Sequence, residues 1–153
     1  MQFSSSFTVL VECLFVVAAA TSVVAIPASG NTVSDEPPPY VTTLDQMMRW
    51  LAATDAEVTF SGAPINPLDT QQTTITFCSH RSGNLCSGPC NVFSGAGVCH
   101  ATPGTNCLSA TTDVSFCDGG NCGGSCNQFN SCGTRLENGF CATPGTNSVS
   151  LPP

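Results

Sequence analysis

Ten cysteines arranged around two matched sets constrain this chain more than any other feature. The matched cysteines are Cys78, Cys86, Cys90 and Cys99 in the first set and Cys117, Cys122, Cys126 and Cys141 in the second. Each set contains a Cys-x-x-x-Cys pair followed by Asn-x-Phe, and each leads into the same hexapeptide, Ala-Thr-Pro-Gly-Thr-Asn, at residues 101–106 and 142–147. Such identity indicates an internal duplication. We predict two tandem cysteine-rich repeats, residues 77–107 and 116–148, with a linker at 108–115 and a tail at 149–153.

The N-terminal segment has the features of a secretory signal peptide. Residues 7–20 are mostly apolar, and Val23-Val24-Ala25 supplies the small residues that a signal peptidase reads. We predict a signal peptide over residues 1–25, with cleavage after Ala28 as the alternative. A membrane anchor is the competing interpretation, since residues 7–26 match the roughly 20 residues of a bilayer span. Glu12 within that stretch and the cleavage motif favour secretion, so we expect an extracellular protein with no membrane attachment after signal removal.

Removal of the signal removes Cys13 and leaves an even number of cysteines. In a secreted chain this pattern is typical of a disulfide framework. We predict disulfides for all of the remaining cysteines: Cys78, Cys86, Cys90, Cys99, Cys107, Cys117, Cys122, Cys126, Cys132 and Cys141. A zinc site is disfavoured, because the spacing is not Cys-x-x-Cys and because His80 and His100 have no counterparts in the second repeat. We therefore expect no metal and no cofactor.

Two cysteines have no counterpart in the other repeat, and they suggest how the repeats are joined. Cys107 follows the first hexapeptide, where the second has Ser148, and Cys132 lies only in the second repeat. If each repeat closes its own four matched cysteines, Cys107 pairs with Cys132 and joins the two repeats. The pairing within each four stays open among three choices.

Two different segments precede the repeats. Residues 26–41 are rich in proline and polar residues, and we expect a disordered leader there. Residues 42–76 are expected to form a helix-and-strand element, with a helix over residues 43–53 that places Leu44, Met47, Met48 and Leu51 on one face. Thr43 and Gln46 form a capping box at its start. Short strands are expected at 57–60 and 73–78.

These features predict a small disulfide-rich fold dominated by loops and short strands. The Pro-Gly of each hexapeptide is expected to form a type II turn. Phe93 and Phe129 hold equivalent positions in the repeats and are expected to be equally buried. A propeptide role for residues 42–76 is the alternative to retention, although no dibasic processing site follows them.

Few residues have the chemistry of a catalytic site. His80 and His100 are candidate bases, and Asp113, Asp118, Glu137 or the pair Asp55 and Glu57 are candidate carboxylates for a glycosidase. None of them occupies a matching position in both repeats, so we predict a protein without catalytic residues. The chain has no lysine and a net charge of −7, which disfavours nucleic acid and anionic membranes as partners.

Several motifs resemble those of small secreted cysteine-rich proteins of mushroom-forming (basidiomycete) fungi. They are Asn84-Leu-Cys86-Ser-Gly-Pro-Cys90, Cys122-Gly-Gly-Ser-Cys126-Asn-Gln-Phe129 and Asn138-Gly-Phe-Cys141, and the resemblance covers residues 44–153. It implies secretion by a fungus, into the cell wall or toward a host or substrate, and it brings no catalytic residue with it.

Three functions compete at this stage. The first is a secreted, non-catalytic binding or interaction protein, whose partner is an extracellular protein or a wall glycan. The second is an effector or inhibitor of a secreted enzyme, which would present residues 135–138, between Cys132 and Cys141, as a rigid loop. The third is a small hydrolase.

Overall fold

A computed structural model describes residues 41–153 of the protein. The expected signal peptide and all but the last residue of the expected leader lie outside the described residues.

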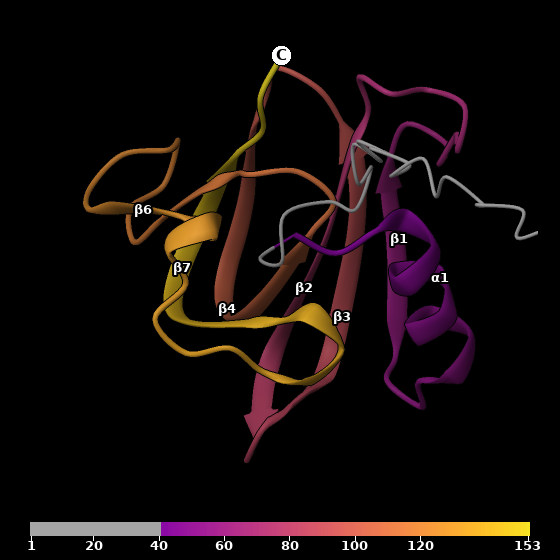
Figure 1. The fold of residues 1–153 in the computed structure, drawn as a ribbon. Coiled ribbons are helices and arrows are strands. Elements are labelled where there is room, and N and C mark those ends of the chain that lie inside the picture. The colour runs from indigo at the N-terminus through magenta and orange to yellow at the C-terminus, as the bar shows by residue number, and fades with distance from the viewer. Residues whose placement is uncertain (1–40) are drawn as a thin grey trace, which may run out of the picture. The chain divides into compact units, whose positions relative to one another are not determined.

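The described residues form one twisted sheet in the order β1-β3-β2-β4-β7-β5-β6 (Figure 1). The strands are β1 (Val58–Gly62), β2 (Thr73–Ser82), β3 (Leu85–Gly95), β4 (Cys99–Ala110), β5 (Ser115–Cys117), β6 (Cys126–Gln128) and β7 (Cys141–Ser150). Neighbouring strands are antiparallel, except that β1 and β3 are parallel. A helix, α1 (Leu44–Ala53), precedes the sheet, and two short 3-10 helices, η1 (Phe129–Ser131) and η2 (Glu137–Gly139), precede β7.

The two hexapeptides pair with each other at the centre of this sheet. They lie in β4 and β7, and Thr105 of the first faces Thr146, its counterpart in the second. On one side of this central pair the order is β4-β2-β3, and on the other it is β7-β5-β6. Each hexapeptide strand is therefore followed outward by the strand that carries the first cysteine of its own sequence repeat.

The strands are longer than the sequence predicts. β2, β3, β4 and β7 contain 10, 11, 12 and 10 residues, so the expectation of a loop-dominated fold with short strands underestimates the sheet. The Pro-Gly pairs explain the difference for β4 and β7. Gly104 and Gly145 have φ values of 72° and 81°, as a type II turn requires, but each lies in a bulge within a continuous strand. The local turn is present without ending the strand.

The segments expected to be a linker and a tail belong to the core. Leu108 and Ala110 end β4 with no exposed surface, and Val114, Val149 and Leu151 are buried. They pack in one apolar cluster with Ile75, Phe77, Phe129 and Cys141. Residues 108–115 and 149–153 thus complete the packing of the sheet.

A second cluster contains much of the disulfide framework and the residues that α1 contacts. It consists of Cys78, Cys90, Cys107, Leu136 and Phe140, and the ring of Trp50 packs against Phe140 at 4.8 Å between centroids. The predicted helix and its capping box are confirmed. The backbone N–H of Gln46 donates to the Thr43 hydroxyl at 3.1 Å, and the backbone N–H of Thr43 donates to the Gln46 side chain at 3.0 Å.

All ten cysteines of the described chain form disulfides, but the predicted connection between the repeats is wrong. The bridges are Cys78–Cys90, Cys86–Cys107, Cys99–Cys122, Cys117–Cys126 and Cys132–Cys141. Each of the two single-copy cysteines, Cys107 and Cys132, pairs within its own sequence repeat. The bridge that joins the repeats is Cys99–Cys122.

One difference between the repeats accounts for this pairing. Cys78–Cys90 and Cys117–Cys126 are equivalent, since each joins residues directly opposite in antiparallel strands, with Cα atoms 4.1 Å apart. On the next strand Cys107 lies opposite Cys78, and Ser148 lies opposite Cys117. Cys107 bonds to Cys86.

The counterpart of Cys86 is Cys122, which has no cysteine to bond with at position 148. Its backbone N–H donates to the Ser148 hydroxyl at 2.9 Å, and its sulfur bonds to Cys99 instead. Cys141, the counterpart of Cys99, bonds to Cys132. A serine in place of a cysteine thus directs the second repeat toward the bridge between repeats.

This explanation predicts the outcome of a double substitution, Cys99→Ala with Ser148→Cys. The first change removes the present partner of Cys122, and the second places a thiol where the first repeat has Cys107. We expect a disulfide between Cys122 and the new cysteine at position 148, detected by peptide mapping without reduction. Cys99→Ala alone is the control and should leave Cys122 as a free thiol. Free thiols at both positions of the double variant would contradict the equivalence of the repeats.

Candidate binding site

The two histidines have different surroundings. His80 is exposed on β2, where its Nδ1 lies 2.9 Å from the hydroxyl of Ser79. His100 on β4 stacks on Phe93, with ring centroids 3.9 Å apart, and contacts the edge of Phe77 at 5.7 Å. Burial among these rings lowers the pKa of His100. The neutral His100 ring therefore packs against the two phenylalanine rings. Phe93 is half-buried and Phe129 is fully buried, so the expectation that they are equally buried is wrong.

The candidate carboxylates of the repeats stabilise turns or remain at the surface. Asp113 accepts a hydrogen bond from the backbone N–H of Asn130 at 2.8 Å, and Asp118 accepts one from the backbone N–H of Ser125 at 2.8 Å. Glu137 is exposed in η2. Asp113 and Asp118 lie on either side of β5, whereas Glu137 lies in η2.

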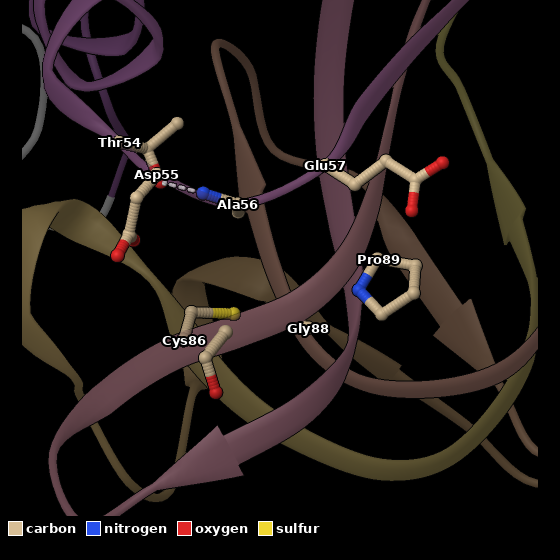
Figure 2. Close-up of a pocket in the computed structure, with 8 residues that line it drawn as sticks. Thr54, Asp55, Ala56, Glu57, Cys86, Gly88 and Pro89 are labelled. Carbon is tan, nitrogen blue, oxygen red and sulfur yellow. Dashed lines mark hydrogen bonds between the residues drawn. The ribbon is translucent and has the colours of Figure 1, made fainter.

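The other candidate pair lies beside a pocket. Asp55 and Glu57 line a surface pocket of about 330 Å³, together with Thr54, Ala56 and residues 86–89. Figure 2 shows their carboxylates pointing in different directions, away from one another. They do not face each other as the two carboxylates of a glycosidase do.

The loop proposed for enzyme inhibition is packed against the protein. The Cys132–Cys141 bridge closes it, but Leu136 is buried, and the Arg135 guanidinium lies over the Phe129 ring at 5.2 Å. Arg135 also donates to the Phe129 carbonyl at 3.1 Å. Burial lowers the pKa of Arg135, and the nearby Asp113 opposes that shift. Of the four side chains in residues 135–138, Leu136 is thus turned inward, whereas Arg135, Glu137 and Asn138 remain exposed.

The structure exposes a different surface, which the sequence analysis missed. Among the described residues, the two most exposed large apolar side chains are Leu68 (90%) and Phe60 (59%). Phe60 lies on β1, at the edge of the sheet, and Leu68 lies in the loop that follows (Figure 1). We call residues 54–68 the β1 surface. The first pocket lies at its beginning, and a second of about 190 Å³, lined by residues 60–65 with Val92 and Ser94, lies farther along it.

Hydrogen bonds brace the loop that carries Leu68. The Gln72 side chain accepts from the backbone N–H of Asn66 at 2.9 Å and donates to the Pro64 carbonyl at 3.0 Å. The Asn66 side chain accepts from the backbone N–H of Leu68 at 3.1 Å, and the backbone N–H of Asp69 donates to the Asn66 carbonyl at 3.1 Å. Leu68 thus lies in a turn fixed by side chains of its own loop.

A signal for this surface is present in the sequence. Phe60, Ile65 and Leu68 alternate with structure-breaking residues at 62–64 and 66–67. Apolar residues between such breakers have little chance to join a strand face or a helix face and are candidates for exposure.

Three comparisons bear on identity. A scan against protein-family models, a search of curated proteins and a search of solved structures each found no match.

Within residues 41–153, no helix has the length and apolar character needed to cross a membrane. The sulfurs of Cys78, Cys86 and Cys107 lie within 4.8 Å of one another, but all three belong to disulfides. Five disulfides define a disulfide-rich, strand-dominated protein and fit an extracellular location.

The burial of His100 predicts a pH-dependent stability. In the unfolded chain His100 regains its ordinary pKa of 6.5, whereas its folded pKa is lower. The unfolded state therefore binds the proton more readily, so this stabilisation is present above pH 6.5 and is lost as the pH falls toward the folded pKa.

We expect His100→Gln to remove part of the loss of unfolding free energy between pH 7.5 and 5, measured by urea denaturation. His80→Gln, which changes an exposed histidine, should keep the wild-type dependence. An identical pH profile for wild type and His100→Gln would contradict the packing role of the neutral ring.

Proposed function

We propose that the protein is a secreted, non-catalytic binding protein that contacts an extracellular partner through the β1 surface. The observation that carries this proposal is the exposure of Phe60 and Leu68 on one continuous segment. Large exposed apolar side chains on one segment make it a candidate for contact with a partner. The signal-like N-terminus and the disulfides support secretion, and the resemblance of the cysteine motifs supports a fungal source.

The rigidity of this region favours binding. β1 hydrogen-bonds to β3, which the Cys78–Cys90 and Cys86–Cys107 bridges tie to β2 and β4. The loop beyond β1 is braced through Gln72 and Asn66. A surface held in one conformation loses little entropy when a partner binds, and so more of the contact energy contributes to affinity.

The two sequence repeats form the part of the sheet that supports the β1 surface. We infer that the repeats are structural as well as sequence repeats. The side chains of Asn106 and Asn147, the last residues of the two hexapeptides, donate to the carbonyls of Ser79 and Asp118, each of which follows the first cysteine of its repeat. Within the described residues, β1 lies beside β3 and has no equivalent beside β6. The β1 surface therefore occurs once in residues 41–153, which supports one binding site in this part of the chain.

A protein partner is favoured over a wall glycan. Binding to sugar rings usually uses several aromatic faces, whereas Phe60 is the exposed aromatic ring of the β1 surface, beside acidic groups. If the partner is a protein, one observation favours the alternative function, an effector or inhibitor of a secreted enzyme. Leu68 lies at the tip of a braced turn, where it can enter an apolar pocket of a secreted enzyme.

The proposal predicts the effect of two matched double variants. Phe60→Ser with Leu68→Ser should lower the affinity for the natural partner at least tenfold, or about 1.4 kcal/mol. The control is Leu85→Ser with Val98→Ser, which changes two exposed apolar residues outside the β1 surface and should bind as wild type does. Each immobilised protein is incubated with secreted proteins of the culture medium, and separately with chitin and β-glucan.

Capture of one protein by wild type and control, but not by the β1 variant, is the expected result. All three should unfold at similar denaturant concentrations, because the changed side chains are exposed. Equal capture by the two double variants would contradict a role for the β1 surface. Retention on chitin or β-glucan by all three proteins, without a protein partner, would instead favour a glycan-binding role.

A further inference from the structure

The hydrogen bonds of β1 show which of its backbone groups face the open edge of the sheet. In a parallel pair, alternate residues direct both N–H and C=O toward the neighbouring strand. The Glu57 carbonyl accepts from the Cys90 N–H at 2.8 Å, and the Ala63 N–H donates to the Ser94 carbonyl at 2.9 Å. Odd-numbered residues therefore face β3, and the backbone groups of Val58, Phe60 and Gly62 face away from it.

This edge lacks the features that usually protect an exposed strand. Edge strands are commonly shortened, bulged or marked by lysine or proline. β1 reads Val-Thr-Phe-Ser-Gly, pairs with β3 in unbroken register, and is exposed from Thr59 to Gly62. The opposite edge strand, β6, has three residues only, so the two edges differ (Figure 1). The β1 edge is therefore able to accept another strand.

The charge at the start of β1 indicates the chemistry of that strand. Asp55 and Glu57 are exposed beside the first pocket (Figure 2). Arg49 forms a salt bridge with a different carboxylate, that of Asp45, at 2.7 Å. These two carboxylates, Asp55 and Glu57, make the start of β1 negatively charged, which favours a cationic side chain at that end of an incoming strand. A second copy of this acidic chain is a poorer fit, since like net charges repel.

We propose that β1 binds an extended segment of a partner polypeptide as an added strand, with Lys or Arg at the end that lies beside Glu57. This inference rests on the proposed function and names its partner class. Main-chain hydrogen bonds to Val58, Phe60 and Gly62 hold the segment, and the exposed Phe60 ring covers one of its side chains.

The test separates the backbone of Phe60 from its ring. Linear dodecapeptides displayed on phage are selected on the wild-type protein, and enriched sequences are synthesised and titrated. Phe60→Ala removes the ring alone. Phe60→Pro removes the ring and the outward N–H, and costs β1 no hydrogen bond to β3. We expect Phe60→Pro to bind at least tenfold more weakly than Phe60→Ala, with the disulfide map of both unchanged.

Two further measurements complete the test. In the first, alternate amides of the peptide are N-methylated. Methylation of the amides that face β1 should abolish binding, and methylation of those that face away should not. This measurement tests the backbone contacts if Phe60→Pro does not fold. Asp55→Asn with Glu57→Gln should weaken binding of Lys- or Arg-containing peptides. Asp45→Asn with Glu137→Gln, an equal loss of charge elsewhere, should not.

Absence of enriched peptides, or equal binding by Phe60→Pro and Phe60→Ala, would overturn strand addition. So would a wild-type dimer in sedimentation that Phe60→Pro dissociates, because the edge would then belong to a second copy. If the natural partner needs Phe60 and Leu68 but binds the proline and alanine variants equally, the proposed function stands and strand addition fails. If neither the Phe60→Ser, Leu68→Ser variant nor Phe60→Pro changes the binding of the natural partner, both the proposed function and strand addition fail.

Discussion

The cross-strand disulfide Cys78–Cys90, beside Cys86–Cys107, is the constraint on which the rest of the sheet depends. The two bridges tie β2, β3 and β4 together, and Cys78, Cys90 and Cys107 are themselves buried core residues. Their sulfurs occupy space that larger apolar side chains fill in other small domains. Each bridge also limits the unfolded chain, contributing about 2–4 kcal/mol. A sheet rich in buried Thr and Ser is stable for this reason, and β1 gains a rigid neighbour in β3.

The repeated sequence and the departures from it lie in different parts of the sheet. The paired hexapeptides at the centre provide a regular framework, and Thr105 faces its counterpart Thr146 there. Ser148 breaks the equivalence, because it leaves Cys122 to bond with Cys99 across the repeats. At the edge of the described sheet the repeats differ again, because β1 lies beside β3 and no corresponding strand lies beside β6. We propose that the regular part gives stability and that the added strand gives the binding surface.

The sequence predicts the parts of this fold that depend on local chemistry. The α1 helix with its Thr43–Gln46 capping box follows from spacing and side-chain type, and the start of β2 follows from the alternation of residues 73–78. The long strands were missed because Pro-Gly bulges resemble strand ends and buried threonines resemble surface. The pairing of Cys107 was mispredicted because counting cysteines does not show that it lies opposite Cys78. The structure-breaking residues at 62–64 and 66–67 give only an indirect signal for the exposure of Phe60, because that exposure also depends on the place of β1 at the edge of the sheet.

The most direct measurement of this framework is peptide mapping of the native protein without reduction. Pepsin at low pH suits it, because thiol–disulfide exchange requires the thiolate and the chain has few sites for trypsin. The expected result links the Cys99 peptide to that of Cys122, and the Cys107 peptide to that of Cys86. A peptide that links Cys107 to Cys132 would contradict the pairing and the role assigned to Ser148.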